Sequence, residues 1–552
     1  MNSGQNNKKP VRVGMISLGC AKNLVDAEIM LGSLVKEGVQ ITNDAASADV
    51  VIVNTCSFID AAQEESVDAI LESAEVREAQ NRGQGLIVSG CLPQRFQEEL
   101  PKLLPEVDAF MGVDQVSKIN EIVENAIAHR SERIASEGAK KPAKKKVMNR
   151  LAALDKQLPK EDHGPVAEVA GKKNPSPAAN LPLFDVTARP IYIPDYETPR
   201  FRLTPNHFAY VKIAEGCNHP CSFCIIPRMR GGHRSRGQSD IVREVQELVR
   251  QGVKEINLIS QDSTYYGLDL RPERTGSIAA PEKFKAATKA LPENASTLCT
   301  LLRELNKIPG DFWIRLLYTH PAHWTDELIS TIAECNKVSR YIDIPLQHIH
   351  PTMLERMRRE TSKDYIVDLI GRIRAGIPGI AIRTTFIVGF PGETEEYFES
   401  LLEFIRQTRF ERMGVFAYSH EDGTRAANMS GHLPEKLKKE RRERAMAEQL
   451  KISREIAKSH VGQRIRVLVE KEAALQELEQ ANISSWEHGL IRAGGSKEKL
   501  RGKYLIARGQ ADAPDIDGRI YIKDAQLGVG DFATVKIIGH TDYDLIAELE
   551  KQ

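Results

Sequence analysis

Residues 208–224, "FAYVKIAEGCNHPCSFC", place three cysteines directly after a short apolar run. The run 208–213 predicts a buried strand, and five further strand-like stretches follow along the chain, each with a helical pattern behind it. These stretches are 254–260, 313–318, 341–345, 382–388 and 413–418. Six strand–helix units predict a partial (βα)6 barrel, a fold that binds its substrates at the carboxyl ends of the strands. The cysteine loop follows the first strand and therefore lies where such a barrel carries its chemistry.

The spacing of Cys217, Cys221 and Cys224 indicates a metal cluster with one open coordination position. A four-iron cluster usually takes four cysteines, so three cysteines leave one iron free for another ligand. An open iron can chelate S-adenosylmethionine and pass it an electron, which yields a deoxyadenosyl radical. The alternative is a structural zinc site with His219 as the fourth ligand, but a histidine between two of the thiols is unlike typical zinc-ligand spacings.

The N-terminal part predicts a parallel α/β domain that carries three separated cysteines. Apolar runs at 11–18, 48–56 and 85–91 are each followed by a helical pattern. Just past these runs stand Cys20, Cys56 and Cys91. Because an open parallel sheet gathers its ligand-binding groups at the carboxyl ends of its strands, we expect these cysteines to meet in space.

The chain is predicted to have three domains and a linker, at 10–130, 131–206 (the largely irregular linker), 207–458 and 459–552. The linker is rich in Lys, Pro, Ala and Ser, and its run Lys140 to Lys146 is either a solvated tether or a contact for RNA phosphates. The last domain has short alternating runs that predict a small antiparallel β-barrel. It holds 13 Lys plus Arg against 15 Asp plus Glu, which argues weakly against binding to phosphates.

Whole-chain composition narrows the classes of protein. The 552 residues contain 76 basic and 76 acidic side chains, so net charge does not recruit nucleic acid. No apolar run reaches the roughly 18 residues of a membrane span, and the first residues lack a secretory signal. We therefore expect a cytoplasmic protein without a membrane partner, in a reducing compartment where close cysteines bind metal.

The cysteine loop, with Phe223 before its last cysteine, resembles the radical S-adenosylmethionine superfamily. The stretches "SLGCAKN", "VIVNTCSFID" and "VSGCLPQ" narrow the resemblance to the methylthiotransferases. This resemblance implies two 4Fe-4S clusters, one on Cys217, Cys221 and Cys224 and one on Cys20, Cys56 and Cys91, with S-adenosylmethionine as cosubstrate. Cys299 and Cys335 lie in helical patterns and are interpreted as ordinary buried thiols.

Two stretches, "SLGCAKNLVDAE" and "SFIDAAQEES", are similar to the RimO-type branch of that family. That branch methylthiolates the β-carbon of an aspartate in the twelfth small-subunit ribosomal protein, by radical hydrogen abstraction, sulfur insertion and methyl transfer. The resemblance further implies a TRAM-like C-terminal barrel, an external electron donor and at most a secondary nucleic-acid contact. The alternatives are a tRNA adenosine methylthiotransferase with the same clusters, and an iron–sulfur carrier without catalytic activity.

Polar groups near the ends of the later strands are candidates for binding the cosubstrate. They are Gln261, Asp262, Gln347, Arg383, Gly389, Gly392 and Glu393. For Arg383 the alternative is an ion pair inside the barrel, and for the two glycines an ordinary strand-to-helix turn. His320, His348 and His350 are left unassigned. Residues 271–297 look inserted at the mouth of the barrel, where we expect them to border the entry path of the protein substrate.

Overall fold

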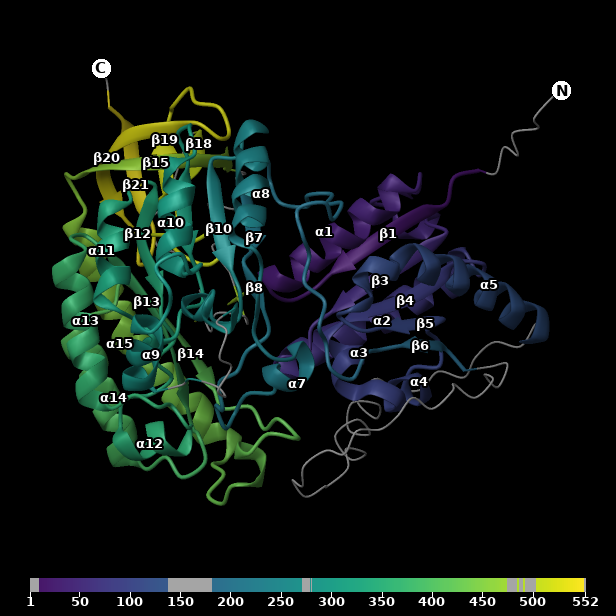
Figure 1. The fold of residues 1–552 in the computed structure, drawn as a ribbon, viewed down its shortest axis with the longest axis horizontal. Coiled ribbons are helices and arrows are strands. Elements are labelled where there is room, and N and C mark those ends of the chain that lie inside the picture. The colour runs from purple at the N-terminus through teal and green to yellow at the C-terminus, as the bar shows by residue number, and fades with distance from the viewer. Residues whose placement is uncertain are drawn as a thin grey trace. The chain divides into compact units, whose positions relative to one another are not determined.

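A computed structural model describes residues 9–137, 181–270, 278, 280–473, 484–485, 490–491 and 503–550 (Figure 1). The run Lys140 to Lys146 lies outside these described residues. The chain forms two compact units. The first contains the N-terminal residues to Leu203 together with 225–232 and 421–424, and the second contains the rest. Each unit has its own sheets and its own core.

The first unit is built on a six-stranded sheet in the order β2-β1-β3-β4-β5-β6, with every neighbouring pair parallel. Its strands are β1 (Arg12–Ser17), β2 (Gln40–Ile41), β3 (Val50–Thr55), β4 (Gly85–Gly90), β5 (Ala109–Met111) and β6 (Leu183–Asp185). Its longer helices are α1 (Ala21–Lys36), α2 (Asp60–Gln80) and α5 (Ile119–Glu137). All residues of β3 and β4 are buried. Their continuous apolar runs are typical of strands that are covered on both faces of a parallel sheet. The predicted parallel α/β domain is confirmed.

The predicted linker, 131–206, overlaps ordered elements near both of its ends. Helix α5 continues to Glu137, and β6 adds three residues to the edge of the first sheet beside β5. Further along, Arg200 forms an ion pair with Glu28 of α1, and the Phe201 amide donates to the Glu28 carbonyl at 2.9 Å. A three-residue strand is too short to show alternation, so the sequence pattern gave no signal for β6.

The second unit contains a six-stranded sheet in the order β14-β13-β12-β11-β10-β7, again with every pair parallel. The strands are β7 (Phe208–Lys212), β10 (Glu255–Ile259), β11 (Trp313–Leu316), β12 (Val338–Asp343), β13 (Ala381–Val388) and β14 (Arg412–Ala417). Their order in the sheet follows their order in the chain, and β7 and β14 remain as two edges. This arrangement confirms the predicted partial barrel of six strand–helix units.

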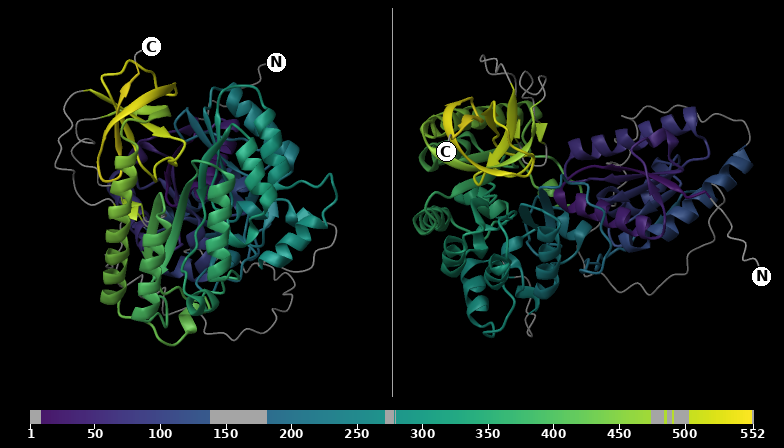
Figure 2. Two further views of the ribbon diagram at one scale, coloured as in Figure 1. Left: turned by 90° about the vertical axis from the view of Figure 1, so that its left-hand side faces the viewer. Right: turned by 90° about the horizontal axis from the view of Figure 1, so that it is seen from above.

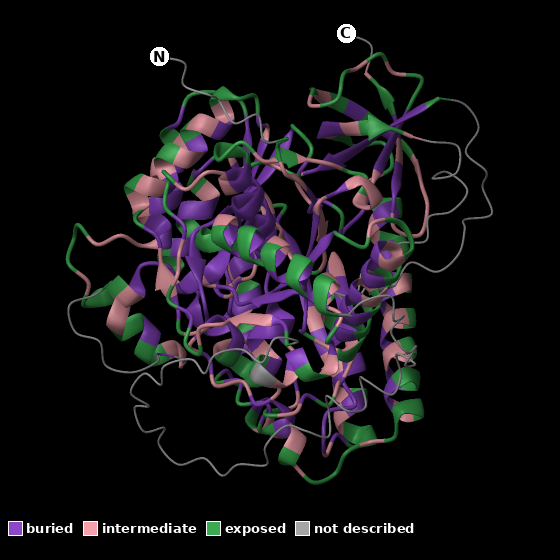
Figure 3. Cartoon of the chain, turned by 90° about the vertical axis from the view of Figure 1, so that its right-hand side faces the viewer, coloured by how far each residue is buried: buried purple, intermediate pink, exposed green. Residues whose placement is uncertain are grey.

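Helices cover the outer face of this sheet (Figure 2). They are α8 (Gln238–Arg250), α10 (Leu298–Lys307), α11 (Asp326–Glu334), α13 (Lys363–Gly376), α14 (Glu395–Thr408) and α15 (Glu435–Ser459). In α8 the residues Ile241, Val245 and Leu248 share one buried face, as their spacing of three and four predicts. Figure 3 shows the same division in the first unit, whose strands are buried beneath helices with exposed outer faces. Each such buried side chain contributes about 1.5–3 kcal/mol to folding.

The C-terminal residues form a closed five-stranded barrel in the order β15-β18-β19-β21-β20, drawn in yellow in Figure 2. Its strands are β15 (Arg464–Glu472), β18 (Tyr504–Gly509), β19 (Ile520–Lys523), β20 (Phe532–His540) and β21 (Leu545–Leu549). The expected small antiparallel barrel is confirmed, with the one difference that β19 and β21 pair in parallel. The sequence pattern did not reveal β21, whose short run ends in exposed Glu548 and Leu549. Among the described residues, no helix is both long and apolar enough to cross a membrane.

Candidate functional site

Three cysteines of the first unit stand at the carboxyl ends of adjacent strands. Cys20 follows β1 and caps α1, Cys56 follows β3, and Cys91 follows β4 as the first residue of the short helix α3 (Cys91–Phe96). Since β1, β3 and β4 are neighbours in the sheet, their ends lie along one edge. This topology brings the three thiols to the same edge of the sheet, as expected.

Two glycines with positive φ angles allow this close approach. A Cβ atom on Gly19, at φ +87°, would lie 2.7 Å from the Cβ of Cys56 and 3.0 Å from its Sγ. A Cβ atom on Gly90, at φ +96°, would lie 2.5 Å from the carbonyl oxygen of Thr55. Both positions therefore require glycine, and the backbone next to Cys20 rests directly against the side chain of Cys56.

The electrostatics of Cys91 indicate a buried thiol close to its partners. Burial raises the pKa of the Cys91 thiol, and the neighbouring Cys20 and Asp26 raise it further, while the Arg230 guanidinium opposes them. All the cysteines of this triad are free of disulfide bonds. Three reduced thiols at one sheet edge are a donor set that fits an iron–sulfur cluster with one open iron.

The second triad lies in the loop after β7 of the second unit. The segment β8 (Ala214–Glu215) pairs with β9 (Arg234–Ser235) and fixes the base of the loop. Ser222 anchors its tip, because its amide donates to the Met357 carbonyl at 3.1 Å and its hydroxyl to the Arg356 carbonyl at 2.7 Å. Burial raises the pKa of Cys217 well above its usual value, and Cys224 and Cys221 raise it further. The three thiols are thus close together and fit the predicted cluster.

Two donors point at the sulfur atoms of this loop. The backbone amide of His219 donates to the Sγ of Cys217 at 3.5 Å. The Nη1 of Arg359 donates to the Sγ of Cys221 at 3.5 Å, while its Nη2 donates to the Pro345 carbonyl at 2.7 Å. Hydrogen bonds to cluster sulfurs stabilise the charge that thiolate ligands carry.

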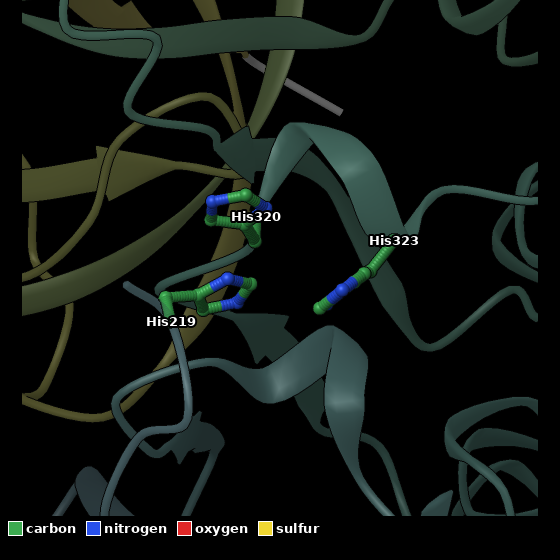
Figure 4. Close-up of side chains that lie close together, drawn as sticks. All are labelled: His219, His320 and His323. Carbon is green, nitrogen blue, oxygen red and sulfur yellow. The ribbon is translucent and has the colours of Figure 1, made fainter. Parts of the chain in front are cut away.

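Three buried histidines, His219, His320 and His323, lie close together at the cysteine loop (Figure 4), and Asp262 contacts two of them. The Oδ2 of Asp262 accepts hydrogen bonds from the Nε2 of His219 and the Nδ1 of His323, both at 2.7 Å. Burial alone would raise the pKa of Asp262, but His323 and His219 outweigh it and hold the pKa well below its usual range. Asp262 thereby fixes His219, which lies between two of the cysteines.

The geometry of His219, His320 and His323 does not suit a metal ion. Their ligand atoms lie within 4.8 Å of one another. However, the rings of His219 and His320 stack at 3.7 Å with an interplanar angle of 14°, so their nitrogen lone pairs do not converge at the roughly 2.0–2.1 Å that zinc requires. Burial lowers the pKa of His219 to about 4 and the pKa of His320 well below its usual value. We interpret the three histidines as a hydrogen-bonded support for the cysteine loop.

Most of the predicted cosubstrate residues lie beyond the carboxyl ends of their strands. Gln261 donates through its Nε2 to Glu215, two residues before Cys217. Phe223 packs against an apolar cluster that includes Met357 and Phe390. Gln347 has a φ of +71° and joins the sheet by a bridge to Phe386. Their roles in binding the cosubstrate stay predictions.

Glu393 and the two glycines form a tightly closed turn. One oxygen of Glu393 accepts from the Gly389 amide at 2.6 Å and from Arg441 at 2.6 Å, and the other accepts from His348 at 3.1 Å. A Cβ atom on Gly389, at φ +73°, would lie 2.5 Å from the Cγ of Lys438. The side chain of Glu393 is therefore engaged within the fold, and the amide of Gly392 donates to the Gly431 carbonyl at 2.8 Å.

Arg383 does not lie with the other predicted cosubstrate residues. It is the third residue of β13, near the amino end of the strand, and its Nε donates to Asp517 of the C-terminal barrel at 3.4 Å. Its Nη1 lies 3.8 Å from Asp343. The structure thus contains the ion pair that the sequence analysis gave as the alternative for Arg383.

Sequence reasoning missed His323, Arg230 and Arg359. The pattern His-x-x-His at 320–323, directly after β11, was a local signal for His323 beside His320. Neither arginine had such a signal, because each reaches its cysteine from a distant part of the chain.

Comparisons with known proteins agree with this arrangement. Residues 12–112 match the uncharacterized protein family UPF0004, residues 211–405 the radical SAM superfamily and residues 497–549 the TRAM domain. A protein of Opitutus terrae named ribosomal protein uS12 methylthiotransferase RimO is 50% identical over 97% of this chain and 96% of its own length. One of the same name from Akkermansia muciniphila is 45% identical over 98% of this chain and 100% of its own.

Among solved structures, the radical S-adenosylmethionine methyltransferase TsrM from Kitasatospora setae, with cobalamin and a [4Fe-4S] cluster bound, is similar with a TM-score of 0.44 and 15% identity. The similarity covers 83% of this chain and 76% of the TsrM chain.

Proposed function

The chain belongs to the RimO family of radical S-adenosylmethionine methylthiotransferases, and from this premise we propose that it methylthiolates the β-carbon of an aspartate in ribosomal protein uS12. The observation that supports this most is the full-length similarity to RimO proteins, since it includes both cysteine-bearing regions and the TRAM domain. We further propose that the protein works in the cytoplasm and receives its electrons from an external donor.

We propose that each cysteine triad holds one 4Fe-4S cluster. When bound, the clusters would supply reduction of S-adenosylmethionine at one site and a sulfur ligand for transfer at the other. The thiols Cys217, Cys221 and Cys224 would hold the cluster that reduces S-adenosylmethionine, and Cys20, Cys56 and Cys91 would hold the N-terminal cluster that carries the sulfur ligand. The support is three free thiols in each case, at the carboxyl ends of β1, β3 and β4 in the first unit and in the single loop after β7 in the second.

The residues of the second unit would orient the cosubstrate. Phe223 would give an apolar contact, and Gln261, Gln347 and the backbone of the turn at 389–392 would give hydrogen bonds. Asp262 would act through His219, because its carboxylate fixes that ring inside the cysteine loop. Such fixed partners keep the loop in a single geometry, and a radical reaction depends on that geometry.

The substrate is proposed to be a protein and not tRNA. The C-terminal domain has a slight acidic excess of 15 Asp plus Glu over 13 Lys plus Arg, which argues weakly against binding to phosphates. We propose that the inserted residues 271–297 border the path by which uS12 enters. Of these, α9 (Pro281–Lys289) packs with Tyr265 and Leu268 at the end of β10.

The test is a mass measurement on a strain that lacks this gene. We expect uS12 to lose the mass of one methylthio group, and a plasmid copy to restore it. Copies with Cys217→Ala or Cys56→Ala should not restore it. Loss of a methylthio group from tRNA, with uS12 unchanged, would favour the tRNA alternative. Unaltered uS12 and tRNA would reject both activities and favour an iron–sulfur carrier.

A further inference from the structure

Arg230 contacts a cysteine of the first triad through a buried side chain. It is the last residue of α7 (Ile226–Arg230), which packs beside α3 in the first unit (Figure 1). Its Nη1 donates to the Oδ2 of Asp26 at 2.6 Å. Its Nη2 donates to the Oδ1 of Asn23 at 3.2 Å and to the Sγ of Cys91 at 3.4 Å. The side chain is only 3% exposed, so this guanidinium is held against the sulfur without competition from water.

The two oxygen partners of Arg230 are fixed by helix α1. Asn23 and Asp26 are three residues apart and therefore share one face of the helix. The Nδ2 of Asn23 donates to the carbonyls of Leu18 at 2.6 Å and Thr55 at 3.2 Å, which leaves its Oδ1 facing Arg230. The carboxylate of Asp26 balances the buried positive charge, as a buried guanidinium requires.

The contact with the sulfur goes beyond what this balance needs. Ile225 and Met229 pack with Cys91 in a small apolar cluster, so α7 is seated over the cysteine. Charge balance does not require this contact, because the Asp26 carboxylate already pairs with the guanidinium. The short helix therefore brings a positive donor to a sulfur that the proposed function makes a cluster ligand.

We propose that Arg230 is a positioning residue for the N-terminal cluster, which hydrogen-bonds the ligating sulfur of Cys91 and raises the reduction potential of the cluster. This inference rests on the proposed function, because it needs a cluster on Cys20, Cys56 and Cys91. Positive charge and hydrogen bonds at the sulfurs favour the more negative, reduced state of a cluster. Asp26 acts in the opposite sense, since its carboxylate offsets part of the guanidinium charge.

The experiment uses the full chain with Cys217, Cys221 and Cys224 replaced by Ala, so that only the first triad can hold iron. The protein is reconstituted without oxygen, its iron is counted, and the midpoint potential is measured by a redox titration followed by electron paramagnetic resonance. The variants are Arg230→Gln and Asp26→Asn. The matched control is Arg228→Gln, because Arg228 lies on the same helix and is exposed.

We expect Arg230→Gln to shift the potential to more negative values and Asp26→Asn to shift it to more positive values. Arg228→Gln should leave it unchanged. A merely structural role would not give opposite shifts from two partners of one ion pair. An unchanged potential in Arg230→Gln, with iron retained, would overturn the inference.

If Arg230→Gln fails to retain iron, the test rests on the midpoint potential of Asp26→Asn. A positive shift then supports the inference, and no shift or a negative shift overturns it. Absence of iron from the parent protein would show that the N-terminal cluster does not form, and it would overturn this inference as well. A parent that holds iron but does not respond to the variants overturns only the role of Arg230, so the two failures are distinguishable.

Discussion

The Nη2 of Arg508, on β18 of the C-terminal barrel, lies 2.6 Å from the Oε2 of Glu255, the first residue of β10. Arg315 binds the other oxygen of Glu255 at 2.6 Å, and all three side chains are almost completely buried. The barrel is thus attached to the amino ends of the central strands. The cysteine loop lies at the opposite, carboxyl edge of the same sheet.

Removing Arg508 should destabilise the second unit strongly. Arg508→Ala leaves Glu255 buried with one partner fewer, and breaking a buried ion pair costs about 3–5 kcal/mol. We expect a clear fall in the midpoint of thermal unfolding. The control is Arg250→Ala, which removes an ion pair with Glu247 whose arginine side chain is 74% exposed. Equal midpoints for the two variants would contradict this interpretation of the barrel contact.

Glu470 should make stability depend on pH at the acidic end. Burial by itself raises the pKa of Glu470, but Arg508 and His207 outweigh it and lower the pKa to about 2. The carboxylate therefore contributes stability above the unfolded pKa of about 4.3, and this contribution is lost as pH falls towards 2. We expect Glu470→Gln to lose less stability than the parent between about pH 5 and pH 3, as followed by urea unfolding. Equal losses of unfolding free energy in the parent and in Glu470→Gln would contradict this role of Glu470.

Gly19 should be needed for the N-terminal cluster. A methyl group at this position would contact Cys56, so Gly19→Ala should displace the cysteine and lower the iron content from about eight to about four per chain. Gly38→Ala is the matched control, because Gly38 has a similar φ of +85° with no atom within 4 Å of the added Cβ. It should cost only about 1 kcal/mol and keep all the iron. If both variants lose iron, the loss is caused by backbone strain and not by the contact with Cys56.

Phe284 of α9 should support the cosubstrate chemistry from the inserted segment. Its ring stacks on His323 at 4.3 Å, and the two ring nitrogens of His323 lie 2.9 Å from the Ile278 carbonyl oxygen and 2.7 Å from the Oδ2 of Asp262. Phe284→Ala should loosen the hydrogen bonds that hold His219, and the rate of S-adenosylmethionine cleavage without protein substrate should fall several-fold. Lys285→Ala, the next and exposed residue of α9, is the control. Unchanged cleavage in Phe284→Ala would show that the stacking does not affect the loop.

Local patterns in the sequence predicted much of this structure. The six central strands and the cysteine positions followed from apolar runs and spacing, which depend on neighbours in the chain. The contacts of Arg230 and Arg359 with sulfur could not be predicted, because tertiary packing brings them to their cysteines. Arg383 is different, because its place at the start of the predicted strand 382–388 already put it at the amino end of the barrel.

The most direct test of the central claim is the mass of a uS12 fragment that contains the target aspartate, after incubation with reconstituted protein, S-adenosylmethionine and a reductant. We predict a product with one methylthio group in place of one hydrogen, formed by the parent and not by Cys56→Ala or Cys217→Ala. An unmodified fragment, in a reaction where the parent holds its iron and cleaves S-adenosylmethionine, would contradict the account.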